Sequence, residues 1–467
     1  MLKVVLINPA PDYSHEEAYD KADYPNLTIC QLAGAIESIT DVLLLDMKYD
    51  RLNLAQVITE IKKHFGLNVD MVGITSYTQE ILLSAQIMKE IKTHLNIRFS
   101  VVGGVHTSFL KKETLEEFPI FDLLVFGEGE DTLIDLVKEI QENGGKDFSW
   151  IKGLAWRLNG NVVVNPARPV ETNLDNLPLP AYHLLKPASC YRISTARGCP
   201  YGCYFCSRPY GNKVRNLSPE KFREMLYTLP KTAKHIEFND ETFAMNYKRT
   251  LEICNIMKEW GGIWGVESRI NIFKKRPELL KIMRDAGLVG IGFGIESADR
   301  NLRKSQNKDF SNKEARNVVQ QCKKLGITTG TYFIFGHPNE TFYSAMKTVL
   351  LALYIGADFA SLGIMVPLPG TLVREMAMKG EGGYRLTSNG WSFYGKQHGH
   401  ALEFKNVSRR MIERLQNVGY FLLFLRNPIK KAKYAWSRRS QILFMLSRHS
   451  NVLRKLLSRN YKQMMIL

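Results

Sequence analysis

Short apolar segments alternate with longer amphipathic ones along the first 140 residues. The apolar runs have the length of buried strands, and the segments between them repeat apolar residues at helical spacing. The expected strands cover residues 3–7, 42–45, 71–75, 99–102 and 123–126. The expected helices cover residues 32–38, 54–64, 78–94 and 132–143. This alternation predicts a doubly wound parallel sheet over residues 1–150, which would bind ligands at the carboxyl ends of its strands.

A second alternating region follows a segment rich in turn-forming residues. Residues 151–187 contain Asn159-Gly160 and several prolines, which predict a hairpin and then an extended connector. Beyond them the expected strands cover residues 192–195, 235–239, 264–268, 290–294, 330–335 and 362–366. Six parallel strands with intervening helices favour a partial (β/α)6 barrel over residues 188–400, with functional groups at the carboxyl ends of the strands. The glycine-rich residues 380–394 are expected to form a loop that closes over the barrel mouth.

The positive charge of the chain is concentrated at its end. The formal net charge is +17, but no acidic residue follows Glu413, and residues 414–467 carry twelve Lys and Arg. Residues 401–467 are therefore expected to form a basic amphipathic tail, with helices over residues 411–425, 437–449 and 452–465. Such a tail favours an anionic surface, and Trp436 and Phe444 favour lipid head groups over nucleic acid phosphates. The alternative is a helical cap on the barrel whose basic face is solvated.

The cysteines and the start of the chain indicate a reducing compartment. Seven cysteines, three of them within one short stretch, do not resemble a secreted disulfide framework. Residues 1–9 are expected to form a strand and a turn, and they lack the features of a signal peptide. No apolar run approaches the length of a membrane span. The expected location is the cytoplasm, with peripheral contact at the inner membrane surface through the tail.

The strongest chemical signal is a segment with three closely spaced cysteines. Cys199, Cys203 and Cys206 are separated by three and then two residues, so their thiolates can converge on one soft metal centre. Three protein ligands leave one coordination position open for chemistry, and the glycines and proline in the segment favour an irregular loop. The alternative is a structural zinc site completed by His183 or His235, although zinc sites usually pair their cysteines in separated knuckles.

This spacing, with an aromatic residue before the last cysteine, resembles the cluster loop of the radical S-adenosylmethionine (SAM) enzymes. The resemblance implies that Cys199, Cys203 and Cys206 hold a [4Fe-4S] cluster whose remaining iron binds the amino and carboxylate groups of SAM. It also implies that Phe205 lies near the adenine. In that family one electron from the cluster yields a 5'-deoxyadenosyl radical, which takes hydrogen from an unactivated C–H bond. A one-electron donor such as flavodoxin or ferredoxin is then required.

Two strand ends in the second region resemble SAM contacts of the same family. Asn239, Asp240 and Glu241 follow the second expected strand and would face the methionine ammonium. A helix N-cap by Asn239 or Asp240 is an alternative that does not exclude this role. Arg269 closes the third strand and resembles the arginine that approaches the SAM carboxylate or the substrate, with a surface ion pair as the alternative.

The resemblance continues through the end of the fourth expected strand and two later turns. Glu296 and Ser297 stand where relatives contact the SAM ribose, and a carboxylate can accept both ribose hydroxyls. The turns at residues 335–341 and 367–371 also match the subgroup. His337 stands where relatives often have another residue, so it would either touch substrate or simply be solvated.

The first region resembles the cobalamin-binding domain that precedes the radical SAM domain in one subgroup of the family. Gly103, Gly104 and Gly127 follow two expected strands, where they would either let the backbone approach a ligand or only form tight turns. Residues 46–51 lack the Asp-x-His-x-x-Gly histidine that ligates cobalt in mutase-type domains. Radical SAM members of this architecture commonly lack it, and some relatives keep the fold without the cofactor. The resemblance implies a Rossmann-like domain with cobalamin as the expected ligand.

These resemblances imply an enzyme that cleaves SAM reductively. The two leading reactions are cobalamin-dependent methyl transfer to an unactivated carbon, and a cobalamin-independent rearrangement, cyclisation or C–C bond formation. The basic tail favours an amphiphilic or natural-product substrate, such as a lipid or isoprenoid. An RNA-modifying enzyme is a further alternative, but the sequence shows no recognisable RNA-binding module, so nucleic acid is not the expected partner.

Overall fold

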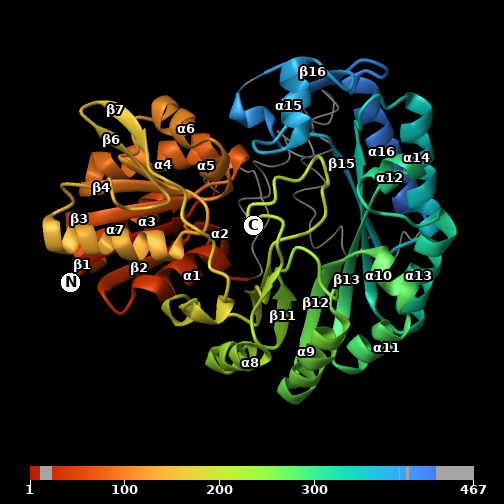
Figure 1. Ribbon diagram of the computed structural model, residues 1–467, viewed down its shortest axis with the longest axis horizontal. Coiled ribbons are helices and arrows are strands. Elements are labelled where there is room, and N and C mark those ends of the chain that lie inside the picture. The colour runs from red at the N-terminus through yellow and green to blue at the C-terminus, as the bar shows by residue number, and fades with distance from the viewer. Residues whose placement is uncertain (11–23, 389, 396–398, 427–467) are drawn as a thin grey trace, which may run out of the picture.

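The computed structural model describes residues 1–10, 24–388, 390–395 and 399–426. It consists of two α/β units that lie side by side, each built on its own large sheet (Figure 1). The helices expected over residues 437–449 and 452–465 lie outside the described residues. Within the described residues, no helix is both long and apolar enough to cross a membrane.

The first unit is built on a sheet whose five leading strands are parallel, as the apolar pattern predicts. Their order is β2-β1-β3-β4-β5. The strands are β1 (Leu2–Asn8), β2 (Thr40–Asp46), β3 (Asn68–Thr75), β4 (Asn96–Gly103) and β5 (Leu123–Val125). The helices are α1 (Leu27–Ile36), α2 (Met47–Asp50), α3 (Leu54–Phe65), α4 (Ile81–His94), α5 (Val105–Phe109), α6 (Lys111–Glu117) and α7 (Glu130–Asn143). Helix α1 begins before the expected residue 32 because the Asn26 side chain accepts a hydrogen bond from the Ile29 N–H and caps the helix.

The predicted hairpin extends this first sheet. Strands β6 (Leu154–Leu158) and β7 (Asn161–Val164) are antiparallel, and β6 pairs antiparallel with β5. Asn159 and Gly160 form the turn with φ values of 50° and 82°, the left-handed backbone that a two-residue hairpin favours. The hairpin at the start of residues 151–187 therefore belongs to the sheet of the first unit.

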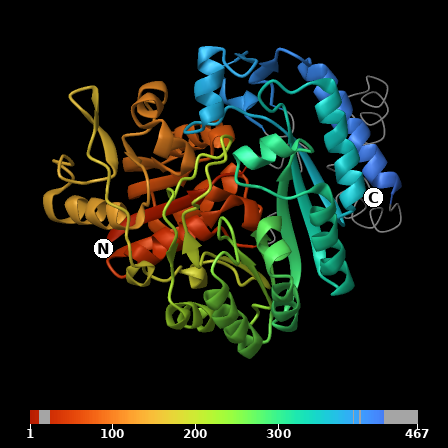
Figure 2. The same ribbon diagram turned by 45° about the vertical axis from the view of Figure 1, so that its right-hand side comes forward.

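The second unit is built on the six-stranded parallel sheet of a partial barrel, as predicted. The strand order is β15-β14-β13-β12-β11-β8. The strands are β8 (Cys190–Ile193), β11 (His235–Phe238), β12 (Ile263–Ser268), β13 (Leu288–Glu296), β14 (Thr328–Phe335) and β15 (Phe359–Ile364). Helices cover the outer side of the sheet (Figure 2). They are α8 (Pro219–Thr228), α9 (Tyr247–Trp260), α10 (Ile270–Lys275), α11 (Glu278–Asp285), α12 (Arg300–Ser305), α13 (Asn312–Lys324) and α14 (Phe342–Ile355).

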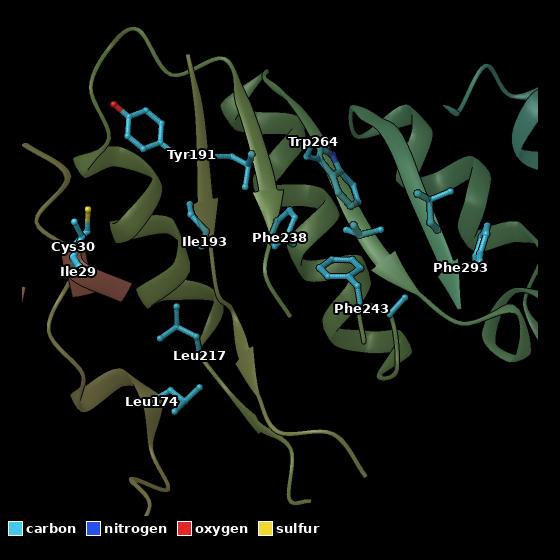
Figure 3. Packing of buried hydrophobic residues seen from close by; sticks show 14 of the residues in the cluster. Ile29, Cys30, Leu174, Tyr191, Ile193, Leu217, Phe238, Phe243, Trp264 and Phe293 are labelled. Atoms are coloured by element: carbon cyan, nitrogen blue, oxygen red, sulfur yellow. The ribbon is translucent and has the colours of Figure 1, made fainter. Parts of the chain in front are cut away.

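An aromatic cluster in the core of the second unit anchors the segment that follows β11. The rings of Phe238 and Phe243 lie 4.9 Å apart, and the Trp264 ring lies 5.5 Å from Phe238 and 5.6 Å from Phe243 (Figure 3). The Trp264 indole N–H donates to the Ala286 carbonyl at 2.7 Å, so burial leaves no unpaired donor. Residues 239–242 lie between the two phenylalanines, so this core fixes the ends of the candidate SAM segment.

The glycine-rich residues 380–394 do not form a loop over the barrel mouth. They contain β16 (Tyr384–Leu386), which pairs with β17 (Leu402–Phe404), and a short 3-10 helix from Trp391 to Phe393. Trp391 is buried against the first unit, with its ring 4.9 Å from His106 and its indole N–H donating to the Glu117 carboxylate at 2.8 Å. This packing depends on residues of the first unit, so the glycine-rich sequence of residues 380–394 does not indicate it.

Candidate functional site

The three cysteines lie in a loop closed by a short antiparallel strand pair. Strand β9 (Ala196–Arg197) pairs with β10 (Arg215–Asn216), so residues 198–214 form one excursion at the carboxyl end of β8. The Cys199 N–H donates to the Gly211 carbonyl at 3.1 Å, and the Cys206 N–H donates to the Cys203 carbonyl at 3.0 Å. These two hydrogen bonds, both within the chain, fold the loop back on itself.

Replacing Gly198 with alanine is expected to prevent correct closure of this loop. Gly198 has φ 94°, and a Cβ atom there would lie 2.1 Å from the Lys213 carbonyl oxygen. Strain of this kind costs about 1–3 kcal/mol and is relieved only by moving the loop. We expect the iron content after anaerobic reconstitution to fall by more than half. Gly211→Ala is the matched control, since Gly211 also has a positive φ of 77° but no atom lies within 4 Å of its Cβ position; equal iron loss in both variants would contradict the prediction.

The two histidines considered for a zinc site pair with carboxylates instead of approaching the cysteines. Within the described residues, no three His, Cys, Asp or Glu side chains converge on one point, as a mononuclear ion requires. His183 pairs instead with Glu37 and His235 with Glu237, each at 2.9 Å. Thiolates that bind different irons of one cluster need not meet at a point. Burial raises the pKa of Cys203, while the cations Lys308 and Arg269 act in the opposite direction and favour its thiolate.

Arg269 is buried beside the cysteine loop and is no surface residue. It is 5% exposed, and its guanidinium carbon lies 3.5 Å from the ring centroid of Tyr201, within the loop. Its Nη2 donates to the Gln306 and Asn307 carbonyls at 2.7 and 3.1 Å. The buried Nε has no hydrogen-bond partner among the described residues. Arg269 therefore supports the loop and keeps one donor for a ligand.

Glu296 ends β13 with a positive φ of 71° and pairs with a residue that sequence reasoning missed. Its Oε1 lies 2.5 Å from Lys308 Nζ, and both side chains are buried. Lys308 also donates to the Gly294 carbonyl at 2.9 Å. No motif marks Lys308, because it lies in the turn between α12 and α13 and approaches the site only through folding. Ser297, the other residue expected at the ribose, is fully buried, and its hydroxyl accepts a hydrogen bond from the Asp299 N–H at 3.1 Å.

Asp240 and Glu241 play different parts in the structure. The Asp240 carboxylate accepts hydrogen bonds from the Thr195 N–H, the Thr195 hydroxyl and the Ala196 N–H at 2.6, 2.7 and 3.0 Å. It therefore anchors the strand that leads into the cysteine loop, and three of its roughly four acceptor positions are used within the chain. Glu241 has a buried oxygen, Oε2, without a partner in the described chain, and burial raises its pKa. Glu241 is thus the carboxylate that this segment offers to a cationic ligand.

His337 is buried and contacts the cysteine loop through Tyr204. It is 1% exposed, and its Nδ1 hydrogen-bonds with the Tyr204 hydroxyl. Tyr204 lies between Cys203 and Cys206, and its neighbour Phe205, the residue expected near the adenine, is partly buried against the main core. The Glu340 carboxylate holds the turn of His337 by accepting its N–H at 3.3 Å.

Glu340 is expected to make stability depend on pH. Burial raises the pKa of Glu340 to about 7, well above its ordinary value. Because the folded pKa exceeds the unfolded one, the carboxyl group binds its proton more tightly when folded, and stability falls as pH rises between about 4.5 and 7. The Glu340→Gln variant lacks this titration. Its free energy of unfolding, relative to that of the natural protein, should therefore rise by up to about 3 kcal/mol as pH increases over that range. Unfolding temperatures of both proteins, measured across the range, check this. A difference that stays constant from pH 5 to pH 8 would contradict this.

A cavity of about 400 Å³ lies between the two units, at the carboxyl ends of β1, β3, β4 and β5. Gly103, Gly104 and Gly127 line it from the first unit, as expected for ligand-binding glycines. Asn239 and Glu241 line it from the second. Most other lining residues are apolar, and none of the described ones is histidine. The glycines allow close backbone approach to a ligand, and the apolar lining suits the apolar surface of a cofactor that takes no imidazole ligand from these residues.

Comparison with known proteins matches both units. Residues 193–352 match the radical SAM superfamily, and residues 18–137 match the B12 binding domain. The uncharacterized methyltransferase PH0819 of Pyrococcus horikoshii is 31% identical over 443 residues, which cover 92% of this chain and 94% of that protein. The anaerobic magnesium-protoporphyrin IX monomethyl ester cyclase of Rubrivivax gelatinosus is 28% identical over 399 residues, covering 81% of this chain and 71% of that protein.

A solved structure shares the arrangement of both units. The cobalamin-dependent SAM radical enzyme OxsB, solved with aqua-cobalamin and SAM bound, superposes with a TM-score of 0.71 over 99% of this chain and 75% of its own. The two sequences are 18% identical, so the likeness is one of fold.

Proposed function

Because this chain belongs to the radical SAM superfamily and carries a B12-binding domain ahead of its radical SAM domain, we propose that it is a cobalamin-dependent methyltransferase. The observation that carries the proposal is the shared cavity, lined by Gly103, Gly104 and Gly127 on one side and by Asn239 and Glu241 on the other. Groups bound on the two sides would approach the same substrate atom, and such positioning is a large source of rate enhancement. The proposed acceptor is an unactivated carbon.

The radical SAM unit would hold its cofactors with residues of the cysteine loop and of the strand ends around it. Cys199, Cys203 and Cys206 would ligate the [4Fe-4S] cluster. When bound and reduced, the cluster supplies the electron that breaks the sulfonium of SAM, and cobalamin supplies the methyl group. Glu241 would accept the SAM ammonium with its unpartnered oxygen, and Arg269 would meet the carboxylate with its free Nε.

Each proposed methylation consumes two SAM molecules. One gives its methyl group and leaves S-adenosylhomocysteine, and the other is cleaved to methionine and 5'-deoxyadenosine as the substrate C–H hydrogen is removed. Glu296 would bind the ribose of SAM while Lys308 neutralises its buried charge at 2.5 Å. The fully buried Ser297 is not proposed as a contact.

Anaerobic reconstitution with iron, sulfide and hydroxocobalamin tests this proposal. The expected protein carries four irons and one cobalt per chain, with cobalamin absorbance beside that of the cluster. A protein with four irons and no cobalt would refute cobalamin dependence and favour the rearrangement or cyclisation reaction. The substrate would be a small amphiphilic molecule; the tetrapyrrole ester named in the related cyclase belongs to this class.

Peripheral membrane contact is proposed for the end of the described chain. Helix α16 (Arg409–Leu425) packs on α14, and its outward residues Val418, Phe421, Phe424 and Leu425 are 41 to 61% exposed. The sequence that follows Arg426 is basic and would bind anionic lipid head groups.

Replacing Phe421 and Phe424 with glutamate is expected to weaken sedimentation of the full chain with phosphatidylglycerol vesicles at least tenfold, because two carboxylates would then face the acyl chains. Tyr227→Glu, at a 66% exposed position on α8, is the control and should bind as the natural protein does. Unchanged sedimentation of the double variant would refute this contact.

A further inference from the structure

Four buried charges join the two units beside the cavity. Glu128 lies between β5 and α7, Glu130 is the first residue of α7, and both line the cavity. Arg197 ends β9 and directly precedes the cysteine loop, and Arg215 is its partner in β10. Arg197 lies 2.7 Å from Glu128 and 2.5 Å from Glu130, and Arg215 contacts the other oxygen of Glu128. We refer to these residues as the four-charge cluster.

The four-charge cluster is balanced and almost inaccessible to solvent. Its side chains are 6 to 11% exposed, and its two positive and two negative charges cancel. The Tyr210 ring lies 5.1 Å from the Arg197 guanidinium carbon and covers it on one side. Buried ion pairs stabilise little in total, but losing one partner is costly because it leaves a buried charge unpaired. The arrangement therefore tolerates very little change in the relative position of the two units.

The location of the cluster gives it a role beyond stability. One side belongs to the loop that lines the cavity in the first unit, and the other to the residue before Gly198 and Cys199. We propose that the four-charge cluster sets the separation of the cobalamin and iron-sulfur sites, with Glu128 as its central positioning residue because it pairs with both arginines. The expected effect of the four-charge cluster on methyl transfer rests on the proposed function. The expected effect on the relative position of the two units does not.

The Glu128→Gln variant tests the proposal with both cofactors present. Pulsed EPR between cob(II)alamin and the reduced cluster should give one narrow distance in the natural protein and a broad or shifted distribution in the variant. The affinity for SAM should change by less than about twofold, while turnover falls by about 100-fold, as for reacting groups displaced by about 1 Å. Asp135→Asn is the control, since it breaks the Arg168–Asp135 pair on α7 without touching the four-charge cluster. An unchanged distance in Glu128→Gln would overturn the proposal.

Hydrogen exchange tests the same geometry without any cofactor. In the apoprotein, Glu128→Gln should speed amide exchange both in residues 127–130 and in residues 197–199, because the two segments hold each other in place. Asp135→Asn should leave the second segment unchanged. Faster exchange in residues 127–130 alone would overturn the proposal, since it would show that the cysteine loop is positioned independently. Failure to bind cobalamin would refute the proposed function and leave this measurement valid.

Discussion

Serine in place of Cys203 is expected to abolish SAM cleavage and to remove the cluster absorbance. Cys203 lies in the middle of the loop, and the cations Lys308 and Arg269 act on its thiolate. A hydroxyl group does not replace a thiolate as a ligand to iron, so the reconstituted variant should lose most of its iron. The production of 5'-deoxyadenosine should fall by at least about 1,000-fold, which corresponds to roughly 4 kcal/mol. Iron analysis and product chromatography measure the two effects.

Cys254→Ala provides the control for this substitution. Cys254 is buried in the core of the second unit, where burial raises the pKa of its thiol to about 12, so it behaves as an apolar side chain. This variant should keep its four irons and cleave SAM at a rate close to that of the natural protein. SAM cleavage that survives in Cys203→Ser would refute the assignment of the cysteine loop.

Leucine in place of Gly103 is expected to abolish cobalamin binding while the iron-sulfur site stays intact. A Cβ atom at Gly103 would lie 3.8 and 3.9 Å from atoms of Val125, which is ordinary contact, so the backbone needs no rearrangement. The rest of a leucine side chain would fill the cavity that Gly103 lines. We expect the dissociation constant for hydroxocobalamin to rise at least about 100-fold, equivalent to roughly 2.7 kcal/mol.

Substitutions of increasing size at Gly103 distinguish filling of the cavity from damage to the fold. Gly103→Ala should weaken cobalamin binding less than Gly103→Leu, because it adds one methyl group. Absorbance titration measures both, and iron content monitors the second unit. If Gly103→Leu binds cobalamin as tightly as the natural protein, the cofactor does not occupy this cavity.

The fold could be predicted where the residues of a single strand are enough to identify it. The apolar residues of β1 and β3 predict buried parallel strands, and their pairing confirms it. The hairpin at Asn159 and Gly160 was predicted from its turn, but its attachment to β5 was not, because strand neighbours depend on contacts between distant residues. For the same reason the loop over the barrel mouth was wrong: Trp391 contacts His106, almost 300 positions earlier in the chain.

In the candidate site, too, features set by neighbouring residues could be predicted, whereas contacts between residues far apart in the chain could not. The cysteine spacing predicts the loop, and the glycines after β4 and β5 predict part of the cavity lining. Lys308 carries no motif and approaches Glu296 only in three dimensions. Asp240 and Glu241 are equivalent in sequence, and only the hydrogen bonds from Thr195 and Ala196 distinguish the anchoring carboxylate from the available one. The ion pairs of Arg197 likewise join residues that belong to different units.

We propose that the cavity between the units holds cobalamin beside the SAM site, so that one SAM gives a methyl group and another gives a radical. The most direct measurement uses reconstituted, reduced protein and SAM with a labelled methyl group, before any acceptor is added. We expect one equivalent of S-adenosylhomocysteine per bound cobalt, with the label retained on the protein, and none from Gly103→Leu. Formation of 5'-deoxyadenosine without any S-adenosylhomocysteine would show that this protein does not transfer a methyl group from SAM to cobalamin.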